Sequence, residues 1–98
     1  MGSKNTKNSR TKVIENAKAT QLCRNPGNAL SKLAAICSEL GEDWCLRVYW
    51  SSGSWEIEIK SSYGILEYAS AVNKSLLAAA KTIALKITED ATNGSIHL

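Results

Sequence analysis

The chain of 98 residues has no phenylalanine, a single histidine, a single proline and no long hydrophobic run. Its longest strongly apolar stretch, residues 76–80, is far shorter than the roughly 20 residues that a membrane-spanning helix needs, so no membrane partner is expected. The one histidine, His97, stands on a polar segment, and no second imidazole is present to share acid–base catalysis or metal binding. These absences exclude a membrane-spanning helix, and they exclude enzymes and metalloproteins whose sites need two or more histidines.

Cysteine, glycine and serine are present, but not in patterns that carry chemistry. Cys23, Cys37 and Cys45 are odd in number and form no Cys-x-x-Cys pair, and no apolar leader precedes them. We therefore expect free thiols that pack as small hydrophobic groups in a reducing cytoplasm. The glycines form no phosphate-binding loop, and no serine has the setting of a nucleophile elbow. The sequence predicts a protein that is not an enzyme and has no cofactor or metal.

Basic residues are concentrated at the start of the chain. The first 24 residues contain Lys4, Lys7, Arg10, Lys12, Lys18 and Arg24 against a single acidic residue, whereas acidic residues outnumber basic ones in the remainder. Residues 1–11 have no apolar side chain after Met1, so they are predicted to form a disordered basic arm. Such an arm either is simply solvated or follows phosphate groups or an acidic protein surface.

Hydrophobic spacing predicts two helices in the first part of the chain. Residues 12–24 have a thin apolar stripe and are expected to form a short helix. Residues 27–40 show a broader stripe, which follows Asn25-Pro26 and ends before Gly41. Asn25 or Asn28 can cap this helix, and glycine is the residue expected just past its end.

All of the aromatic residues lie in the middle of the chain: Trp44, Tyr49, Trp50, Trp55, Tyr63 and Tyr68. Polar and apolar residues alternate on both sides of residues 51–54, which predicts a β-hairpin. The expected register pairs Trp50 with Trp55, Val48 with Ile57, Leu46 with Ile59, Arg47 with Glu58 and Tyr49 with Glu56. In this register apolar residues face each other and arginine faces glutamate, whereas a slip by one residue would mix the two faces.

The end of the domain is predicted from weaker signals. A third strand is expected over residues 65–69, followed by an alanine-rich helix with Asn73 or Ser75 as its cap. Residues 25–88 then form one domain, and residues 89–98 form a flexible tail. The expected fold class is α+β, in the order α-β-β-(β)-α, with two helices packed in one layer on the apolar Trp44/Trp50/Trp55 face of the hairpin.

The outward face of the hairpin carries the group of residues that is best suited to bind a partner. It comprises Arg47, Tyr49, Glu56, Glu58 and Lys60. A tyrosine beside an arginine is a common composition of binding hot spots and can also stack on a nucleotide base. The alternative is that the tyrosine only covers the strand backbone. This face is the predicted partner-binding surface.

The order of elements over residues 25–88 resembles a double-stranded RNA-binding domain, in which a helix is followed by three strands and an alanine-rich helix. The chain departs from that family at two places. The Gly-Pro-His-type loop is Ser51-Ser52-Gly53-Ser54 here, and the Lys-Lys-x-Ala-Lys cluster that opens the last helix is replaced by residues 73–77, which contain a single lysine. The resemblance implies a fold, while the residues that grip phosphates in the family are missing.

Residues 30–88 also resemble small phage-encoded proteins with an α-β-α sandwich. The similarity rests on the Trp55-Glu56-Ile57-Glu58-Ile59 strand and on the alanine-rich helix over residues 75–81. It implies an accessory protein of a phage or mobile element that acts in the host cytoplasm.

The expected function is therefore that of a non-enzymatic interaction protein. It binds and modulates a host macromolecule, such as a protein of a defence system, through the Arg47/Tyr49 face. The alternative is nucleic-acid binding led by the basic arm. A homodimer joined by the open edge of the short sheet is a third reading, because so small a domain buries only about 60% of its unfolded surface.

Overall fold

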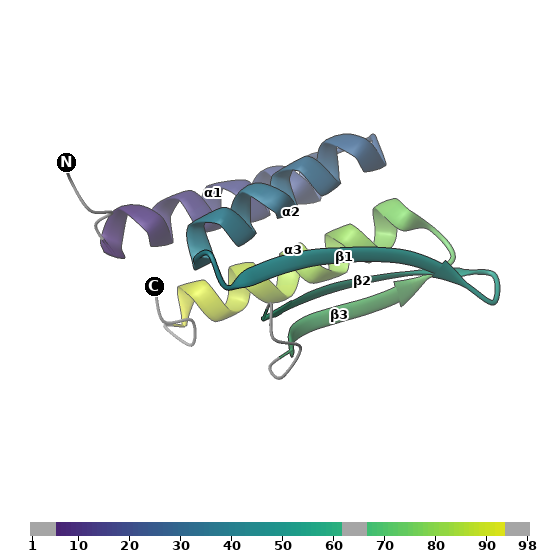
Figure 1. Ribbon diagram of the computed structural model, residues 1–98. Helices are drawn as coiled ribbons and strands as arrows, with labels where there is room; N and C mark the ends of the chain where they lie inside the picture. Colours follow the sequence, from purple (N-terminus) through teal and green to yellow (C-terminus); the bar gives the residue numbers. More distant parts are fainter. Residues whose placement is uncertain (1–5, 62–66, 94–98) are drawn as a thin grey trace.

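The structure, a computed structural model, describes residues 6–61 and 67–93. These residues form the helices α1 (Thr6–Leu22), α2 (Pro26–Leu40) and α3 (Leu76–Thr92), and the strands β1 (Trp44–Ser51), β2 (Ser54–Ser61) and β3 (Glu67–Asn73). The three strands form one antiparallel sheet in the order β1-β2-β3 (Figure 1). The segment α2-β1-β2-β3-α3 has the predicted α+β architecture.

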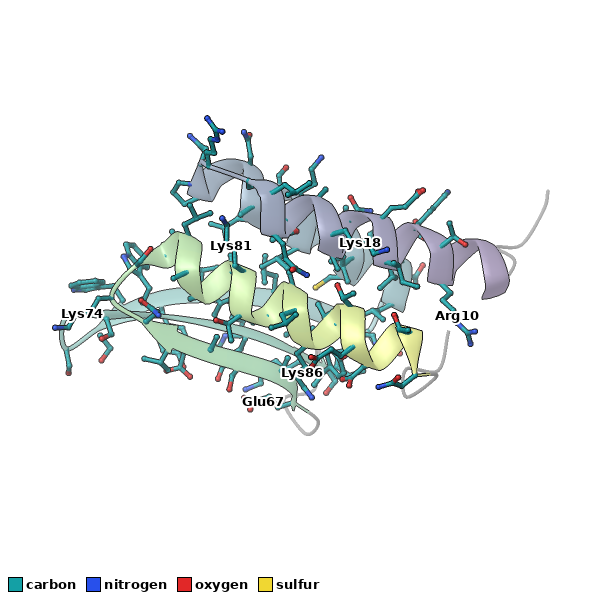
Figure 2. The ribbon with its side chains drawn as sticks, turned by 180° about the vertical axis from the view of Figure 1, so that it is seen from behind. Arg10, Lys18, Glu67, Lys74, Lys81 and Lys86 are labelled. Carbon is teal, nitrogen blue, oxygen red and sulfur yellow. The ribbon has the colours of Figure 1, made fainter. Side chains whose placement is uncertain are left out.

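Both helices of this segment cover the same face of the sheet. α2 packs against β1, and α3 packs against β2 and β3. α1 packs against α2 and α3 and lies on the side of these helices that is remote from the sheet (Figures 1 and 2). The predicted sheet-and-helix pair of layers is therefore present, and α1 adds a further layer on top of it.

The first helix begins earlier than the sequence pattern predicts. A disordered arm was expected over residues 1–11, but residues 6–11 are helical, and residues 1–5 lie outside the described part of the chain. Ser9, Val13, Ala17 and Thr20 form the buried stripe of α1. Thr20 donates its hydroxyl hydrogen to the carbonyl of Asn16 at 2.7 Å, so it can be buried without an unpaired hydroxyl. Small and polar residues fill this stripe, which is why it does not stand out as hydrophobic in the sequence.

The second helix agrees with its prediction. The side chain of Asn25 accepts a hydrogen bond from the backbone N–H of Asn28 at 3.1 Å, so Asn25 is the cap and Pro26 opens the helix. Gly41, with φ of 135°, follows the last turn, and its N–H bonds the carbonyl of Cys37. Leu33 and Ile36 anchor the buried face of the helix.

The predicted hairpin register is confirmed at every pair. Trp50 lies opposite Trp55, Val48 opposite Ile57, Leu46 opposite Ile59, Arg47 opposite Glu58 and Tyr49 opposite Glu56. Ser51 pairs with Ser54, so only Ser52 and Gly53 form the turn, with φ of 54° and 85°. Two consecutive residues with positive φ are the signature of a type I′ turn, whose twist matches that of the strands.

The third strand is present but lies further along the chain than predicted. It covers Glu67–Asn73, whereas the expected strand over residues 65–69 falls partly outside the described residues. Ala69 lies opposite Ile59 and Ala71 opposite Ile57, which extends the apolar face of β2. The register shifts between Ile59 and Lys60. Its small residues give β3 a weak apolar pattern, so the sequence signal ends too early.

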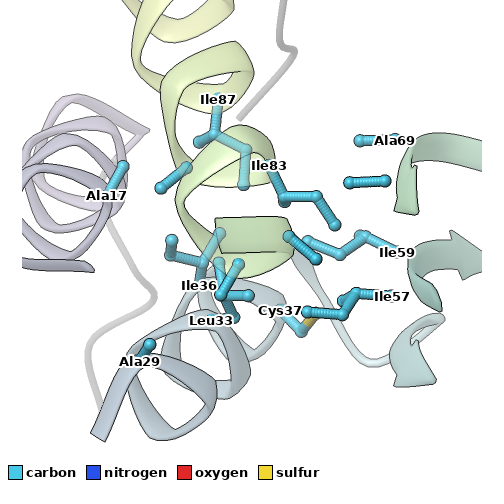
Figure 3. Close-up of a cluster of buried hydrophobic side chains, with 14 of the residues drawn as sticks. Ala17, Ala29, Leu33, Ile36, Cys37, Ile57, Ile59, Ala69, Ile83 and Ile87 are labelled. Carbon is cyan, nitrogen blue, oxygen red and sulfur yellow. The ribbon is translucent and has the colours of Figure 1, made fainter. Parts of the chain in front are cut away.

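The core is built from aliphatic side chains rather than from the tryptophans. Ile57 and Ile59 from the sheet meet Ile83 and Ile87 from α3, and Leu33, Ile36 and Cys37 complete the cluster from α2 (Figure 3). Both helices pack on the Trp44/Trp50/Trp55 face of the hairpin, as predicted, but none of these tryptophans is fully buried. Trp44 and Trp55 are half-buried, and Trp50 is 54% exposed because the end of the hairpin extends past the helices (Figure 1).

The last helix is longer than predicted. Ser75 is its cap and accepts a hydrogen bond from the N–H of Ala78, and the helix continues to Thr92 instead of ending near residue 88. Its buried stripe ends with Ile87 and Ala91. The expected tail therefore includes a last helical turn, while residues 94–98 lie outside the described part of the chain.

Candidate interaction surface

The face of the sheet opposite the helices brings the predicted recognition residues together. Side chains alternate along each strand, so the register places Arg47 and Tyr49 of β1, and Glu56, Glu58 and Lys60 of β2, on this side. Val72 of β3 joins them, because it lies opposite Glu56. We call the surface formed by these six residues the outer sheet face.

Glu58 organises the centre of the outer sheet face. It stands on the middle strand and is only 8% exposed. Its Oε2 atom accepts a hydrogen bond from the hydroxyl of Tyr49 at 3.3 Å, and its Oε1 atom lies 3.7 Å from Nζ of Lys60. Both oxygens of the buried carboxylate are thus partnered, as a buried charge requires. Glu58 and Lys60 therefore stabilise the arrangement of this surface, and their charges are paired with each other.

Tyr49 is the aromatic residue that this arrangement presents to solvent. Its side chain is 37% exposed, and the guanidinium carbon of Arg47 lies 6.0 Å from the centre of its ring. Partial burial, followed by the neighbouring carboxylates of Glu56 and Glu58, raises the pKa of Tyr49 to about 12. Tyr49 is therefore a neutral hydrogen-bond donor at physiological pH, with its hydroxyl fixed by Glu58 and its ring flanked by Arg47.

Val72 extends the surface and was missed by the sequence reasoning. It is 62% exposed and shares a row across the sheet with Glu56 and Tyr49. The predicted third strand ended at Ala69, so Val72 was placed outside the sheet. The alternation of buried Ala69 and Ala71 with exposed Ser70 and Val72 is the signal that could have extended the strand.

A second aromatic group lies at the end of the hairpin, on the other side of the sheet. The rings of Trp50 and Trp55 make an edge-to-face contact with centroids 5.2 Å apart. Trp55 also lies opposite Asn73 at the end of β3. This contact closes the end of the hairpin around the turn, while one face of Trp50 stays in solvent.

Tyr68 forms a tighter polar contact, but one inside the structure. Its hydroxyl donates to Oδ2 of Asp90 at 2.6 Å, and Lys86 bonds the same oxygen at 3.2 Å and lies over the tyrosine ring. The ring also meets Trp44 edge to face. The hydrogen bond from Tyr68, followed by Lys86, lowers the pKa of Asp90, and burial raises the pKa of Tyr68 well above its usual value. The cluster joins β3 to α3.

Five of the six basic residues predicted to act as an arm lie on helix α1 or just after it. Lys4 lies outside the described residues and Lys7 is in the first turn of α1. Arg10, Lys12, Lys18 and Arg24 are exposed on or just after α1. Figure 2 shows Lys18 on α1 and Lys81 on α3 on the same side of the molecule, with Arg10 and Lys74 toward opposite ends.

The exposed charges of α1 and α3 are of both signs. Glu15 is exposed on α1 and Glu89 on α3, and Lys86 is already paired with Asp90. A surface that follows a nucleic acid needs several unopposed cations, since affinity comes from the phosphates that they neutralise. These basic residues are therefore less suited to bind a nucleic acid than a continuous basic stripe would be.

The cysteines do not form a reactive or metal-binding group. Cys37 is 6% exposed, and burial raises the pKa of its thiol to about 11. Cys23 and Cys45 donate their S–H groups to backbone carbonyls of Ala19 and Lys60. Within residues 6–61 and 67–93, no three cysteine, histidine, aspartate or glutamate side chains are placed to hold a metal ion. No helix of the same ranges has the length and apolarity to cross a membrane.

Comparison of the chain with protein-family models, with curated proteins and with solved structures found no match.

Proposed function

We propose that this protein is a small, non-enzymatic interaction module that binds another protein through its outer sheet face. The observation that carries the proposal is the fixed position of Tyr49 on an uncovered face, between Arg47 and the buried carboxylate of Glu58. Tyrosine and arginine are enriched among the residues that dominate the energy of protein interfaces. The resemblance to phage accessory proteins adds that the partner is a host protein, whose activity is modulated by occupation of its surface.

The physical reason lies in the cost of ordering side chains on binding. An exposed side chain that must be immobilised costs roughly 0.5–1.5 kcal/mol. Tyr49 is already restrained at its hydroxyl by Glu58, so it loses less freedom than an unrestrained tyrosine. Val72 adds exposed apolar area in the same row, and Arg47 adds a cation at the edge. The outer sheet face thus places Glu56, Glu58 and Lys60 on its middle strand, with Tyr49 and Arg47 on one edge strand and Val72 on the other.

The test compares baits that differ only on this face. The full chain, the double variant Tyr49→Ala/Arg47→Ala and the control Leu85→Ala are immobilised and exposed to lysate of the source or host cell, with and without nuclease. Leu85 is a good control because it is 49% exposed on α3, away from the outer sheet face. We expect a defined protein that wild type and Leu85→Ala retain after nuclease treatment and that the double variant loses.

Binding of that protein is then measured with purified components. Tyr49→Ala is expected to weaken affinity by a factor of about 30, the effect of a residue that contributes about 2 kcal/mol. Tyr49→Phe keeps the ring but loses the restraint that Glu58 places on the hydroxyl, so its affinity should lie between those of wild type and Tyr49→Ala. Equal affinity for wild type and Tyr49→Ala/Arg47→Ala would reject the outer sheet face as the binding surface. If nuclease removes everything that the bait retains, nucleic-acid binding by Arg10, Lys18 and their neighbours replaces the proposal.

A further inference from the structure

We propose that the outer edge of β1 pairs with the same edge of a second copy of this chain, so that two three-stranded sheets join into one of six strands. The strands pair antiparallel, with Val48 opposite Val48 of the second copy. This inference does not depend on the outer sheet face binding another protein.

The geometry of the hairpin shows which backbone groups are available at this edge. Ser51 and Ser54 flank a two-residue turn and therefore form a hydrogen-bonded pair. Hydrogen-bonded and non-hydrogen-bonded pairs alternate along an antiparallel ladder. The backbone groups of Leu46, Val48 and Trp50 consequently point away from β2. Trp44 follows the same rule, since its N–H bonds the carbonyl of Gly41 instead of β2.

The edge of β1 has one of the features that keep edge strands apart, the charged side chain of Arg47, but lacks several others. It is eight residues long and has no proline, no lysine and no register shift toward β2. Its side chains on the helix-facing side, Trp44, Leu46 and Val48, are only half-buried, whereas Ile57 and Ile59 on the neighbouring strand are fully buried. A weakly protected edge with a partly exposed apolar row is a template for pairing with another strand.

Self-pairing restricts the register to a few choices. Two copies that extend one sheet are related by a twofold axis through the sheet, so residues that face each other must lie on the same side. If Arg47 lay opposite Arg47 of the second copy, two guanidinium groups of like charge would meet, which is unfavourable. If Val48 lies opposite itself, Arg47 faces Tyr49 of the second copy and Leu46 faces Trp50 of the second copy. This register overlaps most of the strand and pairs a cation with an aromatic ring on the outer side.

The exposed face of α2 carries mainly short side chains. α2 is the helix that packs on β1. Its exposed positions include Ser31, Ala34, Ala35 and Ser38, which have short side chains, and Lys32, which has a long one.

The experiment measures the molar mass in solution as a function of concentration. The wild-type mass is expected to rise from 10.6 kDa toward twice that value. Val48→Pro removes an N–H that points to the open edge while it leaves the β1–β2 ladder intact, so this variant should remain a monomer. Val72→Pro is the matched control, because Val72 lies on the opposite edge strand, at a position whose N–H points away from β2. It should dimerise like wild type. Circular dichroism establishes that both variants are folded.

Disulfide cross-linking tests the register independently. In a background with Cys23→Ser, Cys37→Ala and Cys45→Ser, Val48→Cys should form an intermolecular disulfide on mild oxidation, because the pairing places the two Cα atoms about 5.5 Å apart. Val72→Cys in the same background should not.

A wild-type chain that remains monomeric up to about 1 mM would overturn the proposal. So would a dimer that persists in Val48→Pro, or a dimer in which Val48→Cys fails to cross-link.

Discussion

At the scale of single residues, a hydrogen bond of 2.6 Å from the hydroxyl of Tyr68 to Asp90 joins β3 to the last part of α3. Hydrogen bonds to charged groups contribute roughly 1.5–3 kcal/mol when they are protected from water. The Asp90 side chain is 22% exposed, so the contribution of this hydrogen bond to stability lies at the lower end of that range. This contact therefore stabilises the packing of helix on sheet without taking part in binding.

We predict that Tyr68→Phe lowers the free energy of unfolding by about 1–2 kcal/mol at neutral pH. Because the pKa of Asp90 is lowered in the folded protein, its contribution is complete above the ordinary carboxyl pKa of 3.8 and is lost as the pH falls through the lower folded value. The difference between wild type and Tyr68→Phe should therefore shrink below pH 3.8 in urea denaturation. Leu85→Ala, at an exposed position on the same helix as Asp90, serves as the control, and its effect on stability should not change with pH. A difference between wild type and Tyr68→Phe that stays constant with pH would contradict this account.

At the scale of elements, the hairpin was predictable because two independent patterns agree. The alternation of apolar and polar residues fixes the faces, and Arg47 opposite Glu58 fixes the register. β3 was harder to place, because Ala69 and Ala71 bury little area and the strand enters with a register shift next to Lys60. β3 extends to Asn73, so Val72 belongs to the outer sheet face. The candidate surface was predicted without Val72 because the predicted strand ended at Ala69.

We predict that Gly53→Ala destabilises the hairpin by about 1–2 kcal/mol, the cost of a left-handed backbone for a residue with a side chain. Gly53 has φ of 85°, and a Cβ atom there meets nothing within 4 Å, so the effect comes from the backbone and not from a clash. Ser52→Asn should act in the opposite direction by a few tenths of a kcal/mol, because asparagine followed by glycine is preferred in type I′ turns. Urea midpoints of the two variants measure both effects. An unchanged midpoint for Gly53→Ala would reject the assigned turn.

At the scale of the whole molecule, α1 is the element that the sequence described least well. Its stripe of Ser9, Val13, Ala17 and Thr20 contains one strongly hydrophobic residue, so hydrophobic periodicity gave a short helix and an arm. The buried stripe of α1 packs between α2 and α3. Small buried residues on these two helices, such as Ala29 and Ala84, allow the helices to pack closely. Tertiary packing, which a single helix pattern does not contain, determines where α1 begins.

We predict that Ala17→Leu destabilises the protein by about 1–3 kcal/mol, because Ala17 is fully buried between helices and extra methyl groups must displace their neighbours. Glu15→Leu in the same helix is the matched control, and its exposed position should keep the change within about 0.5 kcal/mol. Thermal and urea unfolding of both variants measure the difference. Equal stability of Ala17→Leu and wild type would show that α1 is not packed as described.

The hydrogen bond between Gln21 and Thr88 joins residues 67 positions apart and marks where α1 meets α3. A contact of such long sequence separation closes a long loop, and the entropy lost on closure opposes its formation. During synthesis, α1 can associate with α2 soon after both have emerged from the ribosome, but its second partner is completed only when residue 92 has been added. A nascent chain arrested before α3 therefore leaves the inner side of α1 half covered, and the hairpin lacks the helix that covers β2 and β3. Completion of the fold is in this way tied to synthesis of the last helix, and truncated products of this chain are expected to be recognised by proteases and chaperones.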